Sequence, residues 1–362
     1  MFCIFTVKFI KKKIFILYKM IFTNKNGNQI NVIESDYNNS LNKTKGIMIS
    51  VHGIGSHFQN IGYKFKYNLE GRSKIFYELD LLSYAIELEG HGLSQGKRCC
   101  IYKFDDLVDD VIKLINILKE KNPGLPFYLT GFSMGGAIIV HLCIKYPKLI
   151  SGIVLIAPMC GISDSMKPSK LVEYGLRSLL YFFPTKQWVP GSDSDFLDKC
   201  SKNEDYKKLK RMDTISYKNN QRLTTAFQCL MACEYIKNNS HLFETPLILF
   251  HGNNDLVTDY NISHKFFNSI SSKDKYFVTL DQGYHNLLIQ NDDNDKTPEI
   301  VIKNLKEWLN ERIDNNLIKV NNCKIDDNNL LINKESSTNS LLAILTAFFI
   351  IVMSIIIKIF LL

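Results

Sequence analysis

The segment Tyr128–Ala137, with the sequence YLTGFSMGGA, limits what this chain can fold into more than any other stretch. It holds Ser133 between a run of β-branched and aromatic residues and a helix-forming apolar run, which predicts a strand, a sharp turn and a helix. Gly131 and Gly135, two residues on either side, permit a strained turn that lifts the serine Oγ clear of the sheet. The N-terminus of the following helix would face whatever this serine attacks.

Short apolar runs that predict buried strands recur before and after this turn. They are Gly46–Val51, Leu81–Ile86, Phe127–Thr130, Gly152–Ala157, Pro246–Phe250 and Lys275–Leu280. An amphipathic helix is expected at Phe104–Lys119, and a hairpin at Met20–Thr23 and Gln29–Glu34 around an Asn-Gly turn. This alternation predicts an α/β fold with a doubly wound, mostly parallel sheet that binds ligands at the carboxyl ends of its strands.

The alternation lapses between residues 158 and 245, where an inserted helical cap is expected. Leu171–Phe183 and Thr224–Ile236 carry the apolar or amphipathic pattern of helices. We therefore expect six parts: an N-terminal extension (1–19), the first part of the core (20–157), the cap (158–245), the second part of the core (246–314), a polar linker (315–340) and an apolar C-terminal segment (341–362).

The apolar segment reads LLAILTAFFIIVMSIIIKIFLL. As a helix it would be about 33 Å long, enough for the roughly 30 Å hydrocarbon core of a bilayer. Its one charge, Lys358, lies near the end, where it can reach the interface. We expect a transmembrane tail anchor that leaves the rest of the chain in the cytosol. A glycolipid-anchor signal is the alternative, because Ser336, Ser337 and Ser340 supply small residues ahead of the segment.

The net charge of +8 is concentrated near the start of the chain. The first nineteen residues contain no acid and five lysines, namely Lys8, Lys11, Lys12, Lys13 and Lys19. Because the remainder is close to neutral, nucleic acid is not expected as a ligand. Contact of the N-terminus with anionic lipid and a solvated, unstructured extension both remain open. The nine cysteines include no CxxC pair, which predicts neither a zinc site nor a disulfide framework and fits a reducing compartment.

Acyl transfer by a serine needs a base, an acid that orients the base, and donors for the oxyanion. His285, in DQGYHN after the last core strand, is the candidate base. Asp255, in HGNND after the strand that begins at Pro246, is the candidate acid, with Asp259 as its rival. The chain order Ser, Asp, His is the one expected for a serine hydrolase on such a sheet. No metal and no cofactor are expected.

The oxyanion donors are predicted to be two backbone N–H groups. One belongs to Met134, directly after the serine, and the other to Ile54, in the loop that follows the strand Gly46–Val51. Gly53 lets this loop approach closely. His52 and His57 flank it but have no third ligand at a suitable spacing, so we expect them to hydrogen-bond within the loop and not to bind metal. No chemical role is expected for two further histidines, His91 and His141.

Six blocks of sequence give the chain a family resemblance: His52–His57, Gly90–Arg98, Asn122–Ala137, Ile153–Met159, His251–Asp259 and Gln282–Leu288. Over about Phe22–Glu311 it resembles the monoacylglycerol lipase and lysophospholipase branch of the serine α/β-hydrolases. The resemblance implies that fold, with Ser133 as nucleophile, Asp255 and His285 as its partners, and Ile54 and Met134 as oxyanion donors.

The chain departs from that family at three places. Phe132 stands where the family usually has His, and Glu87 stands where Asp is common. The stretch Phe58–Glu78 is longer than in the animal lipases and resembles lysophospholipase-like members from parasitic protozoa. Because this loop lies near the entrance of the site, it bears on substrate preference.

We expect a membrane-associated serine hydrolase that cleaves the ester of a monoacylglycerol or a lysophospholipid. Apolar residues of the cap are predicted to bind the acyl chain or to rest on the bilayer: Leu171, Leu176, Leu179, Leu180, Phe182 and Phe183. Another esterase, a thioesterase, an acyltransferase and a non-catalytic binding protein on the same fold are the alternatives.

Deleting residues 341–362 is expected to release the protein from membranes while activity on dispersed substrate is retained, because the segment would supply most of the membrane affinity. Membrane pelleting of the full chain and of the truncated chain tests this. A truncated chain that still pellets with membranes would shift the anchoring to residues 1–19 or to the cap.

Overall fold

The computed structural model describes residues 3–10, 13–37, 44–58, 69–161, 177–189 and 194–316. Of these, 177–184 belong to a second compact unit, and the others form the first. The predicted transmembrane segment 341–362 and residues 317–340 of the predicted linker lie outside the described residues. Among the helices that are described, none combines the length and the apolar character needed to cross a membrane.

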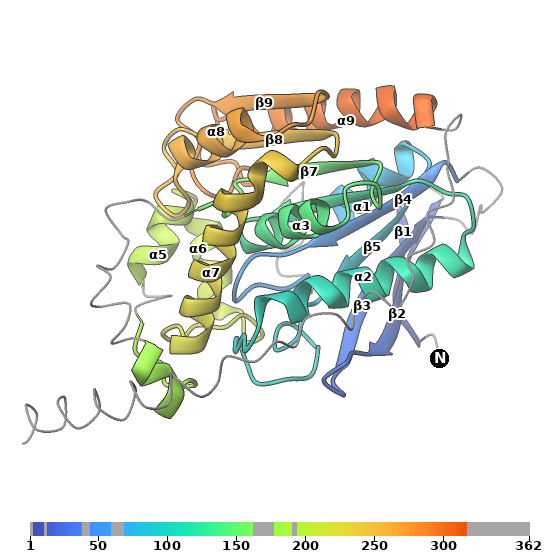
Figure 1. Cartoon of the computed structure of the whole chain (residues 1–362). Coiled ribbons are helices and arrows are strands. Elements are labelled where there is room, and N and C mark those ends of the chain that lie inside the picture. Colours follow the sequence, from blue (N-terminus) through green and yellow to red (C-terminus); the bar gives the residue numbers. More distant parts are fainter. Residues whose placement is uncertain are drawn as a thin grey trace, which may run out of the picture. The chain divides into compact units, whose positions relative to one another are not determined.

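The first unit is built on one sheet, which has nine strands in the described residues, in the order β1-β2-β3-β5-β4-β6-β7-β8-β9 (Figure 1). Strands β4 to β9 pair in parallel, whereas β1, β2 and β3 add antiparallel strands at one edge. The predicted doubly wound, mostly parallel sheet is confirmed. The strands are β1 (Cys3–Ile10), β2 (Lys13–Thr23), β3 (Gln29–Tyr37), β4 (Gly46–Val51), β5 (Leu81–Ile86), β6 (Phe127–Phe132), β7 (Gly152–Ile156), β8 (Leu247–Gly252) and β9 (Lys275–Leu280).

The N-terminal residues correct one prediction. A basic and apolar N-terminal extension was expected over residues 1–19, but residues 3–10 form β1 and residues 13–19 begin β2. The predicted hairpin is present and much longer than expected, since β2 pairs with β3 from Thr23↔Gln29 to Phe15↔Tyr37. Lysines interrupt the apolar runs here, so the sequence pattern did not indicate a strand. An edge strand tolerates lysine, because it lies next to solvent.

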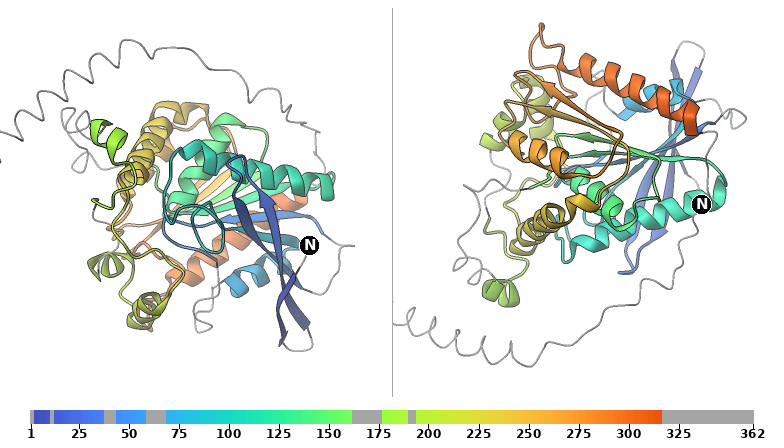
Figure 2. Two further views of the ribbon diagram at one scale, coloured as in Figure 1. Left: turned by 90° about the horizontal axis from the view of Figure 1, so that it is seen from below. Right: turned by 45° about the horizontal axis from the view of Figure 1, so that its top comes forward.

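Helices cover both faces of the sheet (Figures 1 and 2). On one face lie α1 (Leu69–Glu78) and α9 (Thr297–Asn316), whose residues Phe76, Leu305 and Trp308 pack in one cluster with Met48 and Tyr128 of the strands. Each large apolar side chain buried in this way contributes about 1.5–3 kcal/mol. On the other face lie α2 (Phe104–Lys121), α3 (Met134–Lys145) and α8 (Tyr260–Ser269).

Helix α2 matches its prediction and is two residues longer. Its apolar positions are buried, including Leu107, Val111 and Leu118. Aspartates in its first turn and lysines in its last turn complement the helix dipole. The spacing of the apolar residues therefore suffices to place this helix on the sheet.

The regular structure described within 158–245 is helical, apart from one bridge between Val189 and Gln221, and loops join the helices. It contains a short helix at 177–182, then α5 (Ser194–Cys200), α6 (Glu204–Met212), α7 (Leu223–Asn239) and a 3₁₀ turn, η3 (Ser240–Leu242). The predicted helix at Thr224–Ile236 is α7. Of the predicted helix at Leu171–Phe183, residues 171–176 lie outside the described residues.

Candidate active site

Ser133 is the single residue between the end of β6 and the start of α3, and it has φ +54° and ψ −120°. This is a left-handed conformation that a residue with a side chain adopts only when its surroundings enforce it. The two glycines of the motif make the turn possible. A Cβ at Gly131 would lie 2.7 Å from the carbonyl oxygen of Gly135, and one at Gly135 would lie 2.3 Å from that of Val51.

The loop after β4 approaches the serine closely. A Cβ at Gly53 would lie 3.1 Å from the Cβ of Ser133, so only glycine fits there without displacement. Ile54 follows in a turn closed by a hydrogen bond from the N–H of Ser56 to the carbonyl of Gly53. Met134 opens α3, and the first N–H groups of a helix have no acceptor within it. The two predicted oxyanion donors thus belong to two backbone segments that adjoin Ser133.

His52 fixes the start of this loop through both ring nitrogens. Its Nδ1 donates to the carbonyl of Gly53 at 2.7 Å, and its Nε2 accepts the N–H of Leu88 at 3.1 Å. Burial, together with the nearby His91 ring, holds the pKa of His52 well below its ordinary value, so the ring stays neutral. The structure gives His52 the predicted role in loop hydrogen bonding.

Glu87, which the sequence left without a role, fixes the far end of the loop. Its side chain is fully buried, and its carboxylate accepts the N–H of Phe58 at 3.2 Å and the N–H of Leu93 at 2.7 Å. The amide of Asn31 donates to the same carboxylate at 2.9 Å. One acidic side chain therefore joins β3, the loop 52–58 and the loop after β5.

His57 joins the loop to the region predicted as a cap. Its Nε2 lies 3.0 Å from Oδ2 of Asp213, which follows α6, and neither side chain has more than 2% of its surface exposed. The N–H of Tyr217 donates to the carbonyl of Gly55 at 2.9 Å. Because the contacts meet the loop on both sides of Ser56, the loop 52–58 and the segment 213–217 are fixed to each other.

The predicted base and acid lie together. Nδ1 of His285 is 2.8 Å from Oδ2 of Asp255, and both side chains are buried. A carboxylate only accepts, so Nδ1 carries the proton and Nε2 is left to act as a base. The His285 ring also lies 4.9 Å from that of Phe132, measured between centroids, which puts the imidazole beside the serine turn.

Two loops at the carboxyl ends of β8 and β9 hold this pair. A Cβ at Gly252 would lie 2.1 Å from the carbonyl oxygen of Gly283, so the backbones touch. The N–H of Asn254 donates to that carbonyl at 3.1 Å, and its side-chain amide donates to Gln282 at 2.8 Å. Asp255 and His285 are 30 residues apart in sequence and meet because these loops pair.

The groups around Asp255 stabilise the ionised form of its carboxylate. Burial alone would raise its pKa, but the charge and the hydrogen bond of His285, with a hydrogen bond from His251, hold the pKa well below its usual range. Oδ1 accepts the N–H groups of Val257 and Thr258, at 2.8 and 3.0 Å. The carboxylate is therefore ionised wherever His285 could act as a base.

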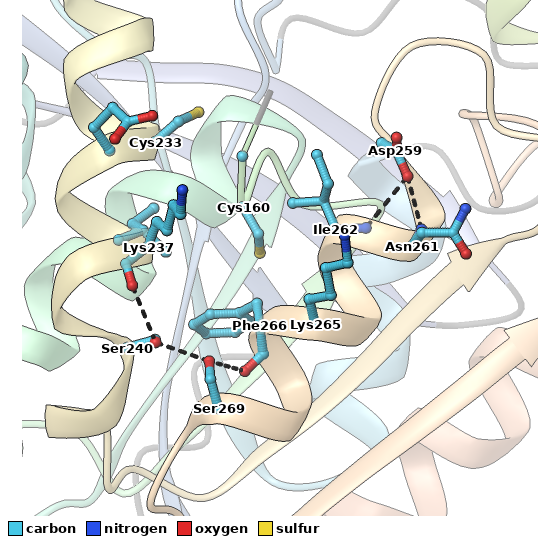
Figure 3. A pocket seen from close by; sticks show the side chains of 13 residues that line it. Cys160, Cys233, Lys237, Ser240, Asp259, Asn261, Ile262, Lys265, Phe266 and Ser269 are labelled. Carbon is cyan, nitrogen blue, oxygen red and sulfur yellow. Dashed lines mark hydrogen bonds between the residues drawn. The ribbon is translucent and has the colours of Figure 1, made fainter. Parts of the chain in front are cut away.

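Asp259, the alternative candidate for the catalytic acid, has a structural role instead. Its Oδ1 accepts the N–H groups of Asn261 and Ile262, at 2.8 and 3.2 Å, and so caps the N-terminus of α8. It lines a cavity between α7 and α8 (Figure 3). The thiols of Cys160 and Cys233 lie in the wall of this cavity, which contains none of Ser133, Asp255 and His285.

His91 and His141 are held by packing. His91 donates from Nδ1 to the carbonyl of Glu89 at 2.9 Å, and burial lowers its pKa to about 4. His141, on α3, stacks on Tyr235 of α7 and lies 3.1 Å from Asp105. No group of His, Cys, Asp and Glu within the described residues is arranged to hold a metal ion.

The predicted acyl-binding residues are only partly described. Leu171 and Leu176 lie outside the described residues. Leu179, Phe182 and Phe183 expose 40%, 51% and 43% of their surface, and Leu180 is half-buried. These four belong to the second unit, so their role toward a substrate stays a prediction.

Residues 42–293 match the family model described as serine aminopeptidase, S33. The chain belongs to this family. Within it, the chain lies in the monoglyceride lipase branch of the α/β-hydrolases, as the sequence resemblance predicted. It is therefore a serine esterase or lipase of that branch.

The relatives agree with this assignment. A caffeoylshikimate esterase from Arabidopsis thaliana is 27% identical over 277 residues, 74% of this chain and 79% of its own. A monoglyceride lipase from Mus musculus is 25% identical over 272 residues, 74% of this chain and 84% of its own. The crystal structure of a soluble variant of monoglyceride lipase from Saccharomyces cerevisiae has a TM-score of 0.65 at 20% identity, over 81% of this chain and 94% of that one. The last likeness shows the fold.

Sequence reasoning missed several groups of this serine hydrolase: Glu87, Asp213, His251 and Thr258. Two carried a readable signal. His251 interrupts an otherwise apolar strand at its carboxyl end, and Glu87 directly follows β5, so both stand where ligands of a parallel sheet gather. Asp213 gave no local signal, because its partner His57 is 156 residues away.

Replacing Asp213 by Asn is expected to lower the free energy of unfolding by about 2 kcal/mol at pH 7, since it removes a buried carboxylate that accepts hydrogen bonds from His57, Ser216 and the N–H of Ile215. Burial by itself raises the pKa of Asp213, but hydrogen bonds from His57 and Ser216 outweigh it and hold the pKa well below the usual range. The stabilisation is therefore present above the unfolded pKa, about 4, and is lost as the pH falls through the folded pKa.

Urea unfolding of wild type and D213N at pH 7, 5 and 3.5 checks this. The difference in stability should persist at pH 5 and shrink at pH 3.5. Asp198, which is 55% exposed and pairs with Lys207, supplies the control D198N, which should change the stability far less. An equal loss in D213N at all three pH values would contradict the assignment.

Proposed function

We propose that the protein hydrolyses the carboxylic ester of a single-chain glycerolipid, a monoacylglycerol or a lysophospholipid, through an acyl-enzyme on Ser133. The observation that carries the proposal is the Asp255–His285 pair beside the elbow at which Ser133 takes φ +54°. A strained serine, an oriented imidazole and a buried carboxylate are what acyl transfer requires.

In this mechanism Ser133 Oγ attacks the ester carbonyl while Nε2 of His285 takes its proton. The N–H groups of Ile54 and Met134 donate to the oxyanion of the tetrahedral intermediate. His285 then returns the proton to the leaving glycerol oxygen, and the C–O bond breaks. Water, deprotonated by the same imidazole, attacks the acyl-enzyme and releases the carboxylic acid and free Ser133. Asp255 keeps the Nδ1 proton in place and stabilises the imidazolium that forms in each half.

Three observations support a lipid as the substrate. The mouse and yeast relatives are named for monoglycerides. The segment around 179–183 exposes leucine and phenylalanine side chains, which suit an acyl chain or a bilayer surface. The sequence of residues 341–362 is mostly apolar, and its only charged side chain is Lys358. The Arabidopsis relative is named for a different ester, so an ester of an aromatic acid is the second candidate.

We also propose that residues 341–362 anchor the protein in a membrane and that the catalytic unit faces the cytosol. The length and apolar character of the segment support the anchor. A lipase held at a membrane meets a membrane-resident substrate without extracting it into water. The five lysines among the first nineteen residues would add attraction to anionic headgroups.

The matched pair D255N and D259N tests the assignment of the acid. An amide at position 255 would turn a donor toward His285 and favour the wrong tautomer, so kcat should fall by about 10⁴-fold. Asparagine caps a helix about as well as aspartate, so D259N should keep both stability and activity. Steady-state rates on one ester substrate compare the two. A larger loss in D259N than in D255N would reverse the assignment.

Substrate class is tested by competing a monoacylglycerol against a lysophosphatidylcholine of the same acyl chain, with a caffeoyl ester as the third arm. One of the two glycerolipids should have the highest kcat/KM. In S133A the activity and the labelling by a fluorophosphonate probe should be lost, by about 10⁴-fold or more. Ser151, half-buried ahead of β7, supplies the control S151A, which should label normally. A higher kcat/KM for the caffeoyl ester than for both glycerolipids would refute the lipid assignment. A folded wild type that the probe does not label would refute the assignment as a serine hydrolase.

A further inference from the structure

Asp255 holds a second histidine besides the predicted base. His251 lies at the carboxyl end of β8, is fully buried, and has its Nε2 3.2 Å from Oδ2 of Asp255. That is the same oxygen to which His285 donates at 2.8 Å. Two imidazoles therefore share one carboxylate oxygen.

The hydrogen bonds of His251 fix its tautomer. Its Nε2 faces only groups that accept or can accept: the Asp255 carboxylate, the carbonyl of Thr258 at 3.2 Å and the hydroxyl of Thr258 at 3.4 Å. The nitrogen must therefore carry a proton. Its Nδ1 is buried and finds no hydrogen-bond partner within the described residues. A proton on Nδ1 would be an unsatisfied buried donor, so the ring is neutral, with the proton on Nε2.

Thr258 completes the cluster. Its hydroxyl donates to Oδ2 of Asp255 at 2.7 Å and lies 3.2 Å from Nδ1 of His285. Oδ2 thus receives a hydroxyl and two imidazole N–H groups, while Oδ1 receives the backbone N–H groups of residues 257 and 258. The negative charge that His285 meets is shared among these donors, and His251 takes part of it.

Other titratable groups face the cluster without competing for the proton. Cys200, on α5, lies close enough for its pKa to be raised by the charge of Asp255, after burial, to about 12, so its thiol stays neutral. The ring of Tyr260, on α8, meets that of His251 edge to face at 5.9 Å. Neither replaces the donor at Nε2 of His251.

We infer that His251 is a positioning residue for the reaction, which sets how strongly Asp255 stabilises the protonated form of His285. The inference rests on the proposed function of Ser133, Asp255 and His285. Without the His251 donor, more of the carboxylate charge would act on His285. The His285 imidazolium would then persist to higher pH. The neutral imidazole that activates Ser133 would therefore form only at a higher pH than in wild type.

The test is the rate of fluorophosphonate labelling of Ser133 between pH 5 and pH 9. In H251L, which removes the donor at similar volume, the acid limb of the profile should move up by about 0.5–1 pH unit. In H251Q, whose amide can still donate to Asp255, the limb should lie within about 0.2 pH unit of wild type. The control H141L removes a buried histidine that pairs with Asp105, away from the site, and should leave the limb unchanged.

If H251L does not fold, H251N takes its place, because its amide is too short to reach Asp255, and the same upward shift is expected. A limb that stays in place while the rate falls equally at every pH would overturn the inference and leave His251 a packing residue. A downward shift would also overturn it. Labelling needs no lipid, so a wild type that labels but cleaves no ester would refute the proposed substrate and leave this readout intact.

Discussion

The buried carboxylate of Asp255 is the group on which the arrangement of this site depends. An unpaired carboxylate in such a position would be too costly to keep ionised. Here two backbone N–H groups, the hydroxyl of Thr258 and the rings of His251 and His285 satisfy it. These donors come from β8, from the loop behind it and from the loop after β9. The hydrogen bonds to the Asp255 carboxylate therefore hold these segments together, and the segments in turn hold the carboxylate in place.

Most of the fold was predictable because its signals are local. The strands Gly46–Val51, Leu81–Ile86 and Lys275–Leu280 begin and end where their apolar runs do. Helix α2 follows from the spacing of its apolar residues. The turn at Ser133 was predictable because Gly131 and Gly135 leave room that no other residue would. The order of Ser, Asp and His along the chain then pointed to the partners that the paired loops bring together.

The remainder was not predictable, because it depends on contacts between distant segments. Asp213 has an ordinary sequence context, and only the folded chain brings it to His57. Glu87 was seen as a variant of a common aspartate, yet its carboxylate binds three segments that the sequence keeps apart. The strands at the N-terminus were missed because lysines break their apolar pattern. Pairing with a neighbouring strand can stabilise a segment whose own pattern is mixed.

The place of β2 in the sheet has a consequence for anyone who shortens this protein. Because Lys19 pairs with Ile33 and Phe15 with Tyr37, a version that starts at Met20 would leave the backbone of residues 33–37 without a partner on that side. The new border would present open N–H and C=O groups to other molecules in solution, which is how sheets recruit foreign strands. Residues 13–19, predicted to be part of an extension, would then be the segment that covers this edge of β3.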